Sequence, residues 1–246
     1  MKHFDTVDAE LALWRDAGLQ PRFWLRDDDA VEPSDRLDRL LDLIGRFGIP
    51  LLLAVIPARA TASLATRLRC EPLVTPCTHG YTHRNHMPDG AKAIELAGRD
   101  ADLVLAELRA GRDLMRDLFQ EKLSGILVPP WNRIAPDVAS RLHECGFSAL
   151  STASWHRTGT TLPELNTQID VMDWTGGRTG HSPEAIAAEL LRRLRQARDR
   201  GGAPLGILSH HLVHDETAWS TLEDLISYLS IEHGLPFCAA DALVGA

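Results

Sequence analysis

The sequence lacks the cysteine pattern of a disulfide framework. It has four cysteines, and no two of them form a CxxC pair. Scattered cysteines favour free thiols in a reducing compartment. Cys77 lies two residues before a histidine. Because free cysteine is among the most buried residue types, we interpret Cys77 as a core residue rather than a thiolate ligand.

The chain also lacks a membrane-spanning run and a basic surface. No apolar run is long enough to cross a bilayer, and residues 1–18 carry charged side chains where a signal peptide would be continuously apolar. We therefore expect a cytoplasmic protein without a membrane partner. The formal net charge of -8 and the pI near 5.7 argue against a nucleic-acid partner, which would need a concentrated basic patch.

What the sequence does contain is a regular alternation of strand-like runs and amphipathic helical segments. Residues 51–56 are continuously apolar, as in a strand buried on both faces, and residues 91–121 are predicted to form one long or broken helical segment, with Gly98 and Gly111 as weak points. The alternation predicts a parallel sheet with helical crossovers, arranged as a distorted (β/α) barrel of seven or eight strands. We expect one domain over residues 1–246, with residues 1–20 as an N-terminal helical extension.

Chemically reactive side chains follow five of the predicted strands. They lie in the acidic triplet 27–29, the histidine-rich stretch 79–86, the turn 129–133, the Asp-Trp pair 173–174 and the His-His pair 210–211. In barrels and open parallel sheets, active sites gather at the carboxyl ends of the strands. The five groups therefore predict a single site at that edge of the sheet.

Two histidines of this set have the spacing of metal ligands. His79 and His83 are four residues apart, so both imidazoles can lie on one face of a helical turn, and a carboxylate of the acidic triplet can complete a set of three ligands. Two imidazoles and one carboxylate suit Zn²⁺ best, and Co²⁺, Ni²⁺, Fe²⁺ or Mn²⁺ are compatible with the same ligands. Three protein ligands leave a position open for water, as in catalytic zinc sites.

The order of these motifs resembles the polysaccharide deacetylase family, which has a NodB-homology domain and includes carbohydrate esterase family 4. The resemblance extends from about Phe23 to His211. It implies a distorted (β/α) barrel and a metal-dependent hydrolase that removes an acetyl or similar acyl group. The substrate would be a small molecule or an oligosaccharide with an N-acyl group, so the bond cleaved would be a non-peptide carbon–nitrogen bond.

The resemblance also implies roles for individual residues. Residues 25–29 would align with the family's Thr-Phe-Asp-Asp-Gly motif, which makes Asp27 the general base and Asp28 the metal ligand beside the two histidines. His210 would be the general acid, although a one-residue change in strand register would exchange it with His211. The residues expected to contact the substrate are Trp131, Arg133, Asp173 and Trp174.

Two positions depart from the family pattern and leave alternatives open. Asp29 stands where the family usually has glycine, so the base and the ligand could instead be Asp28 and Asp29. Val128 stands where the family has the arginine that orients the base, and Arg26 or Arg133 could replace it.

Two other functions are compatible with the same motifs. One is hydrolysis of other non-peptide C–N bonds on the same scaffold, and the other is carbohydrate binding without catalysis. A complete set of metal ligands, base and acid favours a hydrolase, because binding alone requires no proton transfer.

Replacement of His83 by alanine should abolish stoichiometric metal binding and hydrolysis, because it removes one of two imidazole ligands. Metal analysis of the purified protein and an assay of acyl release measure the two effects. His143, which lies outside the five groups, provides the control when it is replaced by alanine. Bound metal and activity that both survive in the His83 variant would exclude the predicted metal site.

Overall fold

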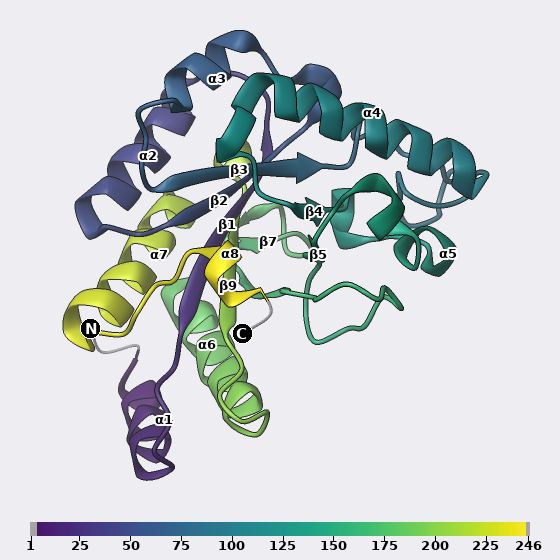
Figure 1. The fold of residues 1–246 in the computed structure, drawn as a ribbon. Helices are drawn as coiled ribbons and strands as arrows, with labels where there is room; N and C mark the ends of the chain where they lie inside the picture. Colours follow the sequence, from purple (N-terminus) through teal and green to yellow (C-terminus); the bar gives the residue numbers. More distant parts are fainter. Residues whose placement is uncertain (1–3, 245–246) are drawn as a thin grey trace.

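The centre of the molecule is a curved, seven-stranded parallel sheet with helices around it, as the computed structural model shows for residues 4–244 (Figure 1). The strand order is β5-β4-β3-β2-β1-β9-β6. The strands of this sheet are β1 (Phe23–Ala30), β2 (Leu51–Val55), β3 (Val74–His79), β4 (Ile126–Val128), β5 (Ala149–Leu150), β6 (Thr167–Asp170) and β9 (Leu205–Ser209). A separate antiparallel hairpin consists of β7 (Met172–Asp173) and β8 (Thr179–Gly180).

The sheet curls into a barrel that is not fully closed. Within residues 4–244 no regular ladder joins its two edge strands, β5 and β6. An isolated bridge links Ala153, which follows β5, to Thr167 of β6. The central strands read as apolar runs because both of their faces are buried, and every residue of β2 is buried. The predicted distorted (β/α) barrel of seven or eight strands is therefore confirmed, and the sheet in the described residues has seven.

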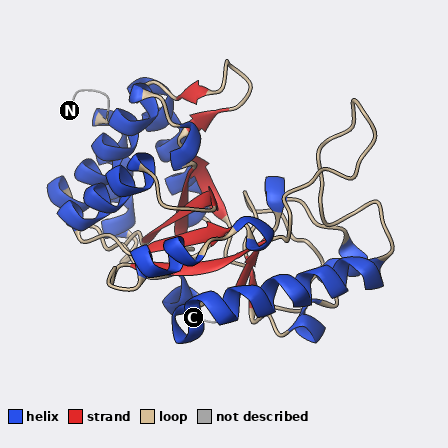
Figure 2. Cartoon of the chain, turned by 90° about the horizontal axis from the view of Figure 1, so that it is seen from above, coloured by secondary structure: helices blue, strands red, loops and turns tan. Residues whose placement is uncertain are grey.

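Helices cover the outer face of the sheet, and long loops extend from the other side (Figure 2). The helices are α1 (Asp5–Asp16), α2 (Asp35–Phe47), α3 (Ala62–Leu68), α4 (Ala101–Phe119), α5 (Pro136–Ala139), α6 (Pro183–Arg198), α7 (Glu216–Ser227) and α8 (Ala240–Leu243). Helix α2 shows why they form: Ser34 caps its first turn, Gly48 ends it with φ 66°, and its leucines face the core. None of the helices in residues 4–244 is long and apolar enough to cross a membrane.

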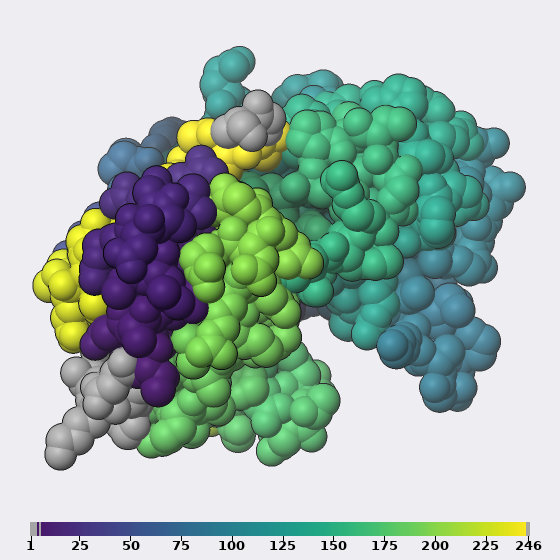
Figure 3. All heavy atoms as spheres, turned by 90° about the horizontal axis from the view of Figure 1, so that it is seen from below, coloured from purple at the N-terminus to yellow at the C-terminus, as the bar shows by residue number. Residues whose placement is uncertain are grey.

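Helix α1 packs against α6 as part of the outer layer (Figure 3). Its side chains Val7 and Trp14 are buried in the main core, and the buried carboxylate of Glu10 accepts a 2.7 Å hydrogen bond from Arg198 on α6. The predicted N-terminal extension thus contains a helix that packs onto the barrel. Residues 1–3 of that extension lie outside the described part of the chain.

The predicted helix over residues 91–121 is wrong in its first ten residues. Helix α4 begins at Ala101, where the side chain of Asp100 accepts hydrogen bonds from two backbone N–H groups of the first turn. Gly98 lies just before it with φ 73°, a conformation that no helix contains. The segment between β3 and α4 is therefore a long loop, and it borders the site described below.

Replacement of Leu40 by alanine should lower the free energy of unfolding by about 2–5 kcal/mol, because the change leaves a cavity in the main core. Leu40 lies on α2 and is fully buried against the sheet. Leu103, which is 61% exposed on α4, is the matched control, and its replacement by alanine should change stability little. If urea titrations show that the Leu40 and Leu103 variants lose the same free energy of unfolding, this description of the core is contradicted.

Candidate metal centre and active site

A cavity of about 560 Å³ opens at the carboxyl ends of the sheet strands. All five reactive groups that the sequence predicted to meet there contribute to its walls, and so does the hairpin β7–β8, whose turn carries Trp174 and Arg178. The lining residues are Asp28, Asp29, His79, His83, Trp131, Asn132, Arg133, Asp170, Trp174, Arg178, His210 and Val213.

The acidic triplet is divided at the end of β1. Asp27 of β1 pairs with Leu53 of β2, and Ala30 pairs with Val55. The segment of β1 between these pairs is therefore one residue longer than the matching segment of β2, which is a β-bulge. Asp29 has φ 76°, in the left-handed region that aspartate tolerates better than most residues. This bulge directs neighbouring carboxylates to different places, as bulges near active sites commonly do.

Asp29, rather than Asp28, lies beside the two histidines. One carboxylate oxygen of Asp29 is 3.1 Å from Nε2 of His79 and 3.1 Å from Nε2 of His83. One ligand atom from each of these three residues lies within 4.8 Å of the others, as a group that could hold a metal ion requires. The carboxylate beside the two histidines is thus that of Asp29, which is the ligand in the alternative register shifted by one residue. Which aspartate binds a metal stays a prediction.

The histidine rings are oriented for coordination. Nδ1 of His79 lies 2.9 Å from the carbonyl oxygen of Val128, on the neighbouring strand β4. Nδ1–H can donate to this carbonyl, and Nε2–H then donates to Asp29; a bound metal would take the place of the Nε2 proton, as in metal-binding histidines whose Nδ1–H is held by a carbonyl. His83 is held on its other side by Trp131, with 4.3 Å between ring centroids. The donor set and its orientation fit a divalent metal such as Zn²⁺.

The charge state of Asp29 also fits a ligand. Burial on its own would raise the pKa of its carboxyl, but the hydrogen bonds to His79 and His83 hold that pKa well below its usual value. A carboxylate that stays ionised at neutral pH needs no deprotonation before it binds a cation.

Asp28 is held by Arg26 instead. Nη2 of Arg26 donates a 3.0 Å hydrogen bond to one oxygen of Asp28, and Nε lies 2.9 Å from the other oxygen, so the ion pair involves both oxygens, and both side chains are buried. Asp28 nevertheless lines the cavity next to the three candidate ligands. Of the two arginines that the sequence suggested for orienting the base, Arg26 is the one in contact with this carboxylate.

The remaining donors of Arg26 connect three parts of the barrel. Nη1 donates to the hydroxyl of Ser151 at 2.8 Å and to the carbonyl groups of Ser151 and Thr152, which follow β5. Nη2 also donates to the side-chain oxygen of Asn132 at 2.6 Å. The guanidinium group thereby ties the central strand β1 to the far edge of the sheet and to the turn that carries Trp131.

Asp27 does not line the cavity in this structure. Its carboxylate accepts hydrogen bonds from the Ser209 hydroxyl at 2.6 Å and from the His211 backbone N–H at 2.9 Å, and it also contacts Nδ1 of His211. Both Asp27 and His211 are completely buried. Because side chains alternate along a strand, the residues Asp27 and His211 face away from the cavity while Asp28 and His210 face it.

His210 directly follows β9 and lines the cavity. Strands β1 and β2 separate β9 from β3, the strand that ends at His79. The His210 ring contacts Trp174 edge to face, with 4.8 Å between centroids. The indole N–H of Trp174 donates to Asp170 at 2.8 Å, and Asp170 also lines the cavity. Asp173 lies elsewhere: its carboxylate accepts hydrogen bonds from the backbone N–H groups of Thr175 and Gly176 and caps their turn.

Of the four residues expected to contact the substrate, Trp131, Arg133 and Trp174 line the cavity and Asp173 does not, and the substrate contacts themselves stay a prediction. Burial raises the pKa of the Asp170 carboxyl, although the nearby His210 opposes this effect. The sequence offered only a weak signal for Asp170, a carboxylate three residues before the Asp-Trp pair. Asn132 lies in the turn 129–133 that the sequence singled out, but nothing in the sequence indicated its contact with Arg26, which depends on how the turn folds.

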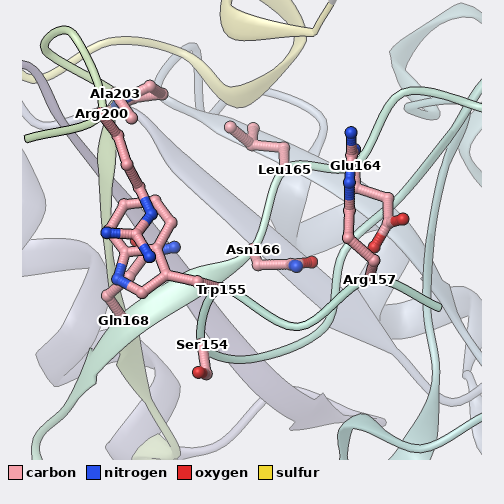
Figure 4. Close-up of a pocket in the computed structure, with 10 residues that line it drawn as sticks. Ser154, Trp155, Arg157, Glu164, Leu165, Asn166, Gln168, Arg200 and Ala203 are labelled. Atoms are coloured by element: carbon pink, nitrogen blue, oxygen red, sulfur yellow. The ribbon is translucent and has the colours of Figure 1, made fainter. Parts of the chain in front are cut away.

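A second cavity, of about 410 Å³, lies between the loop that carries Trp155 and the end of α6 (Figure 4). Arg200 stacks on the Trp155 ring at 4.7 Å, and no histidine lines the cavity. The cavity beside His79 and His83 is thus the one that combines the candidate ligands with neighbouring acid and base groups.

Comparison with known proteins identifies the fold. No protein-family model matches the sequence, and no curated protein matches it. Among solved structures, one similar chain is a Mycobacterium smegmatis protein assigned as a polysaccharide deacetylase, with TM-score 0.67, 18% identity, and 91% of this chain and 88% of that chain covered. The chain has the fold of the polysaccharide deacetylases.

Two further structures show the range of proteins with this fold. A family 4 acetyl xylan esterase from Clostridium thermocellum, in complex with a cobalt ion, has TM-score 0.54 and 15% identity over 90% of this chain and 89% of its own. A carbohydrate esterase family 4 pseudoenzyme from Bacillus anthracis has TM-score 0.61 and 13% identity over 91% of this chain and 65% of its own. The fold therefore occurs in enzymes and in a pseudoenzyme, so activity must be argued from the site.

Replacement of Arg26 by methionine should lower the free energy of unfolding by about 3–5 kcal/mol, because it leaves the Asp28 carboxylate buried without its partner. In the Arg26→Met, Asp28→Asn double variant the loss should be smaller than the sum of the single losses. Arg39, whose ion pair with Glu216 is exposed, is the control, and Arg39→Met should leave the urea midpoint nearly unchanged. If the loss in the free energy of unfolding of the double variant equals the sum of the two single losses, Arg26 and Asp28 are not coupled, and the description of this ion pair is contradicted.

Proposed function

We propose that this protein is a metal-dependent hydrolase that removes an acetyl or similar acyl group from an N-acylated, carbohydrate-like substrate. One observation carries the proposal. A three-residue metal set, a buried carboxylate held by an arginine and a histidine on the facing wall all line a single cavity. Binding alone would not need this combination of acid, base and ligands.

In this proposal Asp29, His79 and His83 hold the metal. Their distances and the orientation of His79 support the assignment. The bound ion would supply a Lewis acid that lowers the pKa of a water molecule and polarises the acyl oxygen. Zn²⁺ suits the ligands best, and Co²⁺ is a second choice by ligand type.

The protein's own groups would then transfer the protons. Asp28 would accept a proton from the attacking water, while Arg26 holds its two oxygens in place. The water oxygen forms a bond to the acyl carbon, and the bond from that carbon to the leaving nitrogen breaks. His210 would donate a proton to this nitrogen, so that a carboxylic acid and an amine result. Asp28 and His210 thus replace the expected pair of Asp27 and His210.

Aromatic walls support a carbohydrate-like substrate. Trp131 and Trp174 line the cavity, and Trp174 is 39% exposed, so its ring is available for stacking. Arg133 and Arg178 add hydrogen-bond donors at the same cavity. We propose a small molecule or an oligosaccharide as the substrate. The cytoplasmic location expected from the sequence stays a prediction.

The alternative function is carbohydrate binding without catalysis. It is supported by one observation, namely that one protein of this fold is a pseudoenzyme. A panel of N-acetylated sugars and simple amides separates the possibilities. Turnover of the sugars supports the proposal, and turnover of the simple amides alone would favour a hydrolase of other non-peptide C–N bonds. Sugar binding without turnover by the metal-loaded protein would favour the binding role.

Asp28 and Asp29 should respond differently to substitution. Asp29→Ala should lose bound metal and activity together, because it removes a ligand. Asp28→Asn should keep stoichiometric metal and lose roughly 10²- to 10⁴-fold in kcat, because it removes the general base. Metal analysis and acetate release measure the two effects on the same preparations. Metal retained by the Asp29 variant and lost by the Asp28 variant would reverse the assignment.

A further inference from the structure

The turn that carries His83 is folded around the carboxylate of Glu95. Oε1 of Glu95 accepts hydrogen bonds from the backbone N–H groups of Thr82 at 2.7 Å and His83 at 3.1 Å, and from the Thr82 hydroxyl at 2.8 Å. Oε2 accepts a fourth from the backbone N–H of Tyr81 at 3.2 Å. Three successive backbone N–H groups thus point at one side chain, which is the arrangement of an anion-binding nest.

Glu95 is completely buried, although a carboxylate is costly to remove from water. In the described part of the chain no lysine or arginine forms an ion pair with it, so the turn 81–83 supplies its hydrogen bonds. Such charge-assisted bonds are short and strong compared with those between neutral groups. The carboxylate and the turn therefore stabilise each other.

The backbone of the turn adopts conformations that need this support. His83 has φ 58°, in the left-handed region that is uncommon for a residue with a side chain. Gly80 has φ 57°, and a Cβ atom at that position would lie 2.1 Å from Oε2 of Glu95. The carboxylate thus occupies the space that the glycine leaves free.

The neighbour of Glu95 is fixed to the segment that follows Trp131. The next residue, Leu96, is fully buried, and its carbonyl oxygen accepts a 2.9 Å hydrogen bond from the backbone N–H of Ala135. Ala135 belongs to the segment that follows Trp131, whose ring contacts the His83 ring at a tilt of 54°. The backbone of His83 and the ring of His83 are therefore held by one connected unit.

We propose that Glu95 is a positioning residue that fixes His83 for metal coordination. The inference rests on the metal site in the proposed function. Glu95 is not among the three groups that would touch the metal, so its effect passes through the backbone of residues 81–83. Groups that orient a metal ligand typically change metal affinity about 10- to 100-fold when they are removed.

Co²⁺ titration monitored by visible absorption tests the proposal, because the spectrum reports the geometry of the ligands as well as the affinity. Glu95→Ala should bind Co²⁺ about 10- to 100-fold more weakly than the unaltered protein, with a changed spectrum. Glu95→Gln, which keeps one acceptor oxygen and the side-chain size, should be intermediate. If Glu95→Ala does not fold, Glu95→Gln alone decides the comparison.

Glu10→Ala is the matched control. Glu10 is also a buried carboxylate, 2% exposed, but it binds Arg198 on the outer helices, far along the chain from the ligands. Its replacement should lower the unfolding midpoint without altering the affinity for Co²⁺ or the spectrum. Unchanged Co²⁺ affinity and spectrum in the Glu95 variants would overturn the positioning role and leave the metal site intact. Failure of the unaltered protein to bind Co²⁺ would overturn the metal site and the positioning role together.

Discussion

The arrangement of the site depends on the buried guanidinium group of Arg26. A fully buried charge is tolerated only when its donors are paired, and those of Arg26 bond to Asp28, Asn132 and the residues that follow β5. These partners belong to the centre of the sheet, to its far edge and to the turn with Trp131. One side chain therefore fixes the relative positions of elements that the open barrel does not join by a regular ladder.

The division between Asp28 and Asp29 follows from the backbone at the end of β1. The sequence predicted that the acidic triplet would lie at a strand end beside the histidines, because the strand pattern before it is clear. It left open which carboxylate meets them, since a side-chain period of two assigns faces only where the strand is regular. The bulge and the φ of 76° at Asp29 exist only in the folded sheet, where β1 pairs with β2.

Local pattern was enough for the barrel and for the strand-end position of the reactive groups. The spacing of His79 and His83 brought the pair to attention, but not through a helical turn, because His79 ends β3 and His83 lies in a loop with φ 58°. Local pattern was not enough for groups that reach the site through loops. Asn132 meets Arg26 across 106 residues of sequence, and Glu95 lies in a segment that had a helical pattern. Such contacts have no periodic signal, because they depend on tertiary hydrogen bonds of buried polar groups rather than on burial of apolar faces.

Anomalous diffraction from a crystal grown with Zn²⁺ tests the central claim most directly. We predict one strong peak at the zinc edge, bonded to a carboxylate oxygen of Asp29 and to Nε2 of both His79 and His83, with Asp28 still paired to Arg26. A peak coordinated by Asp28 in place of Asp29, or no peak beside the two histidines, would contradict the account.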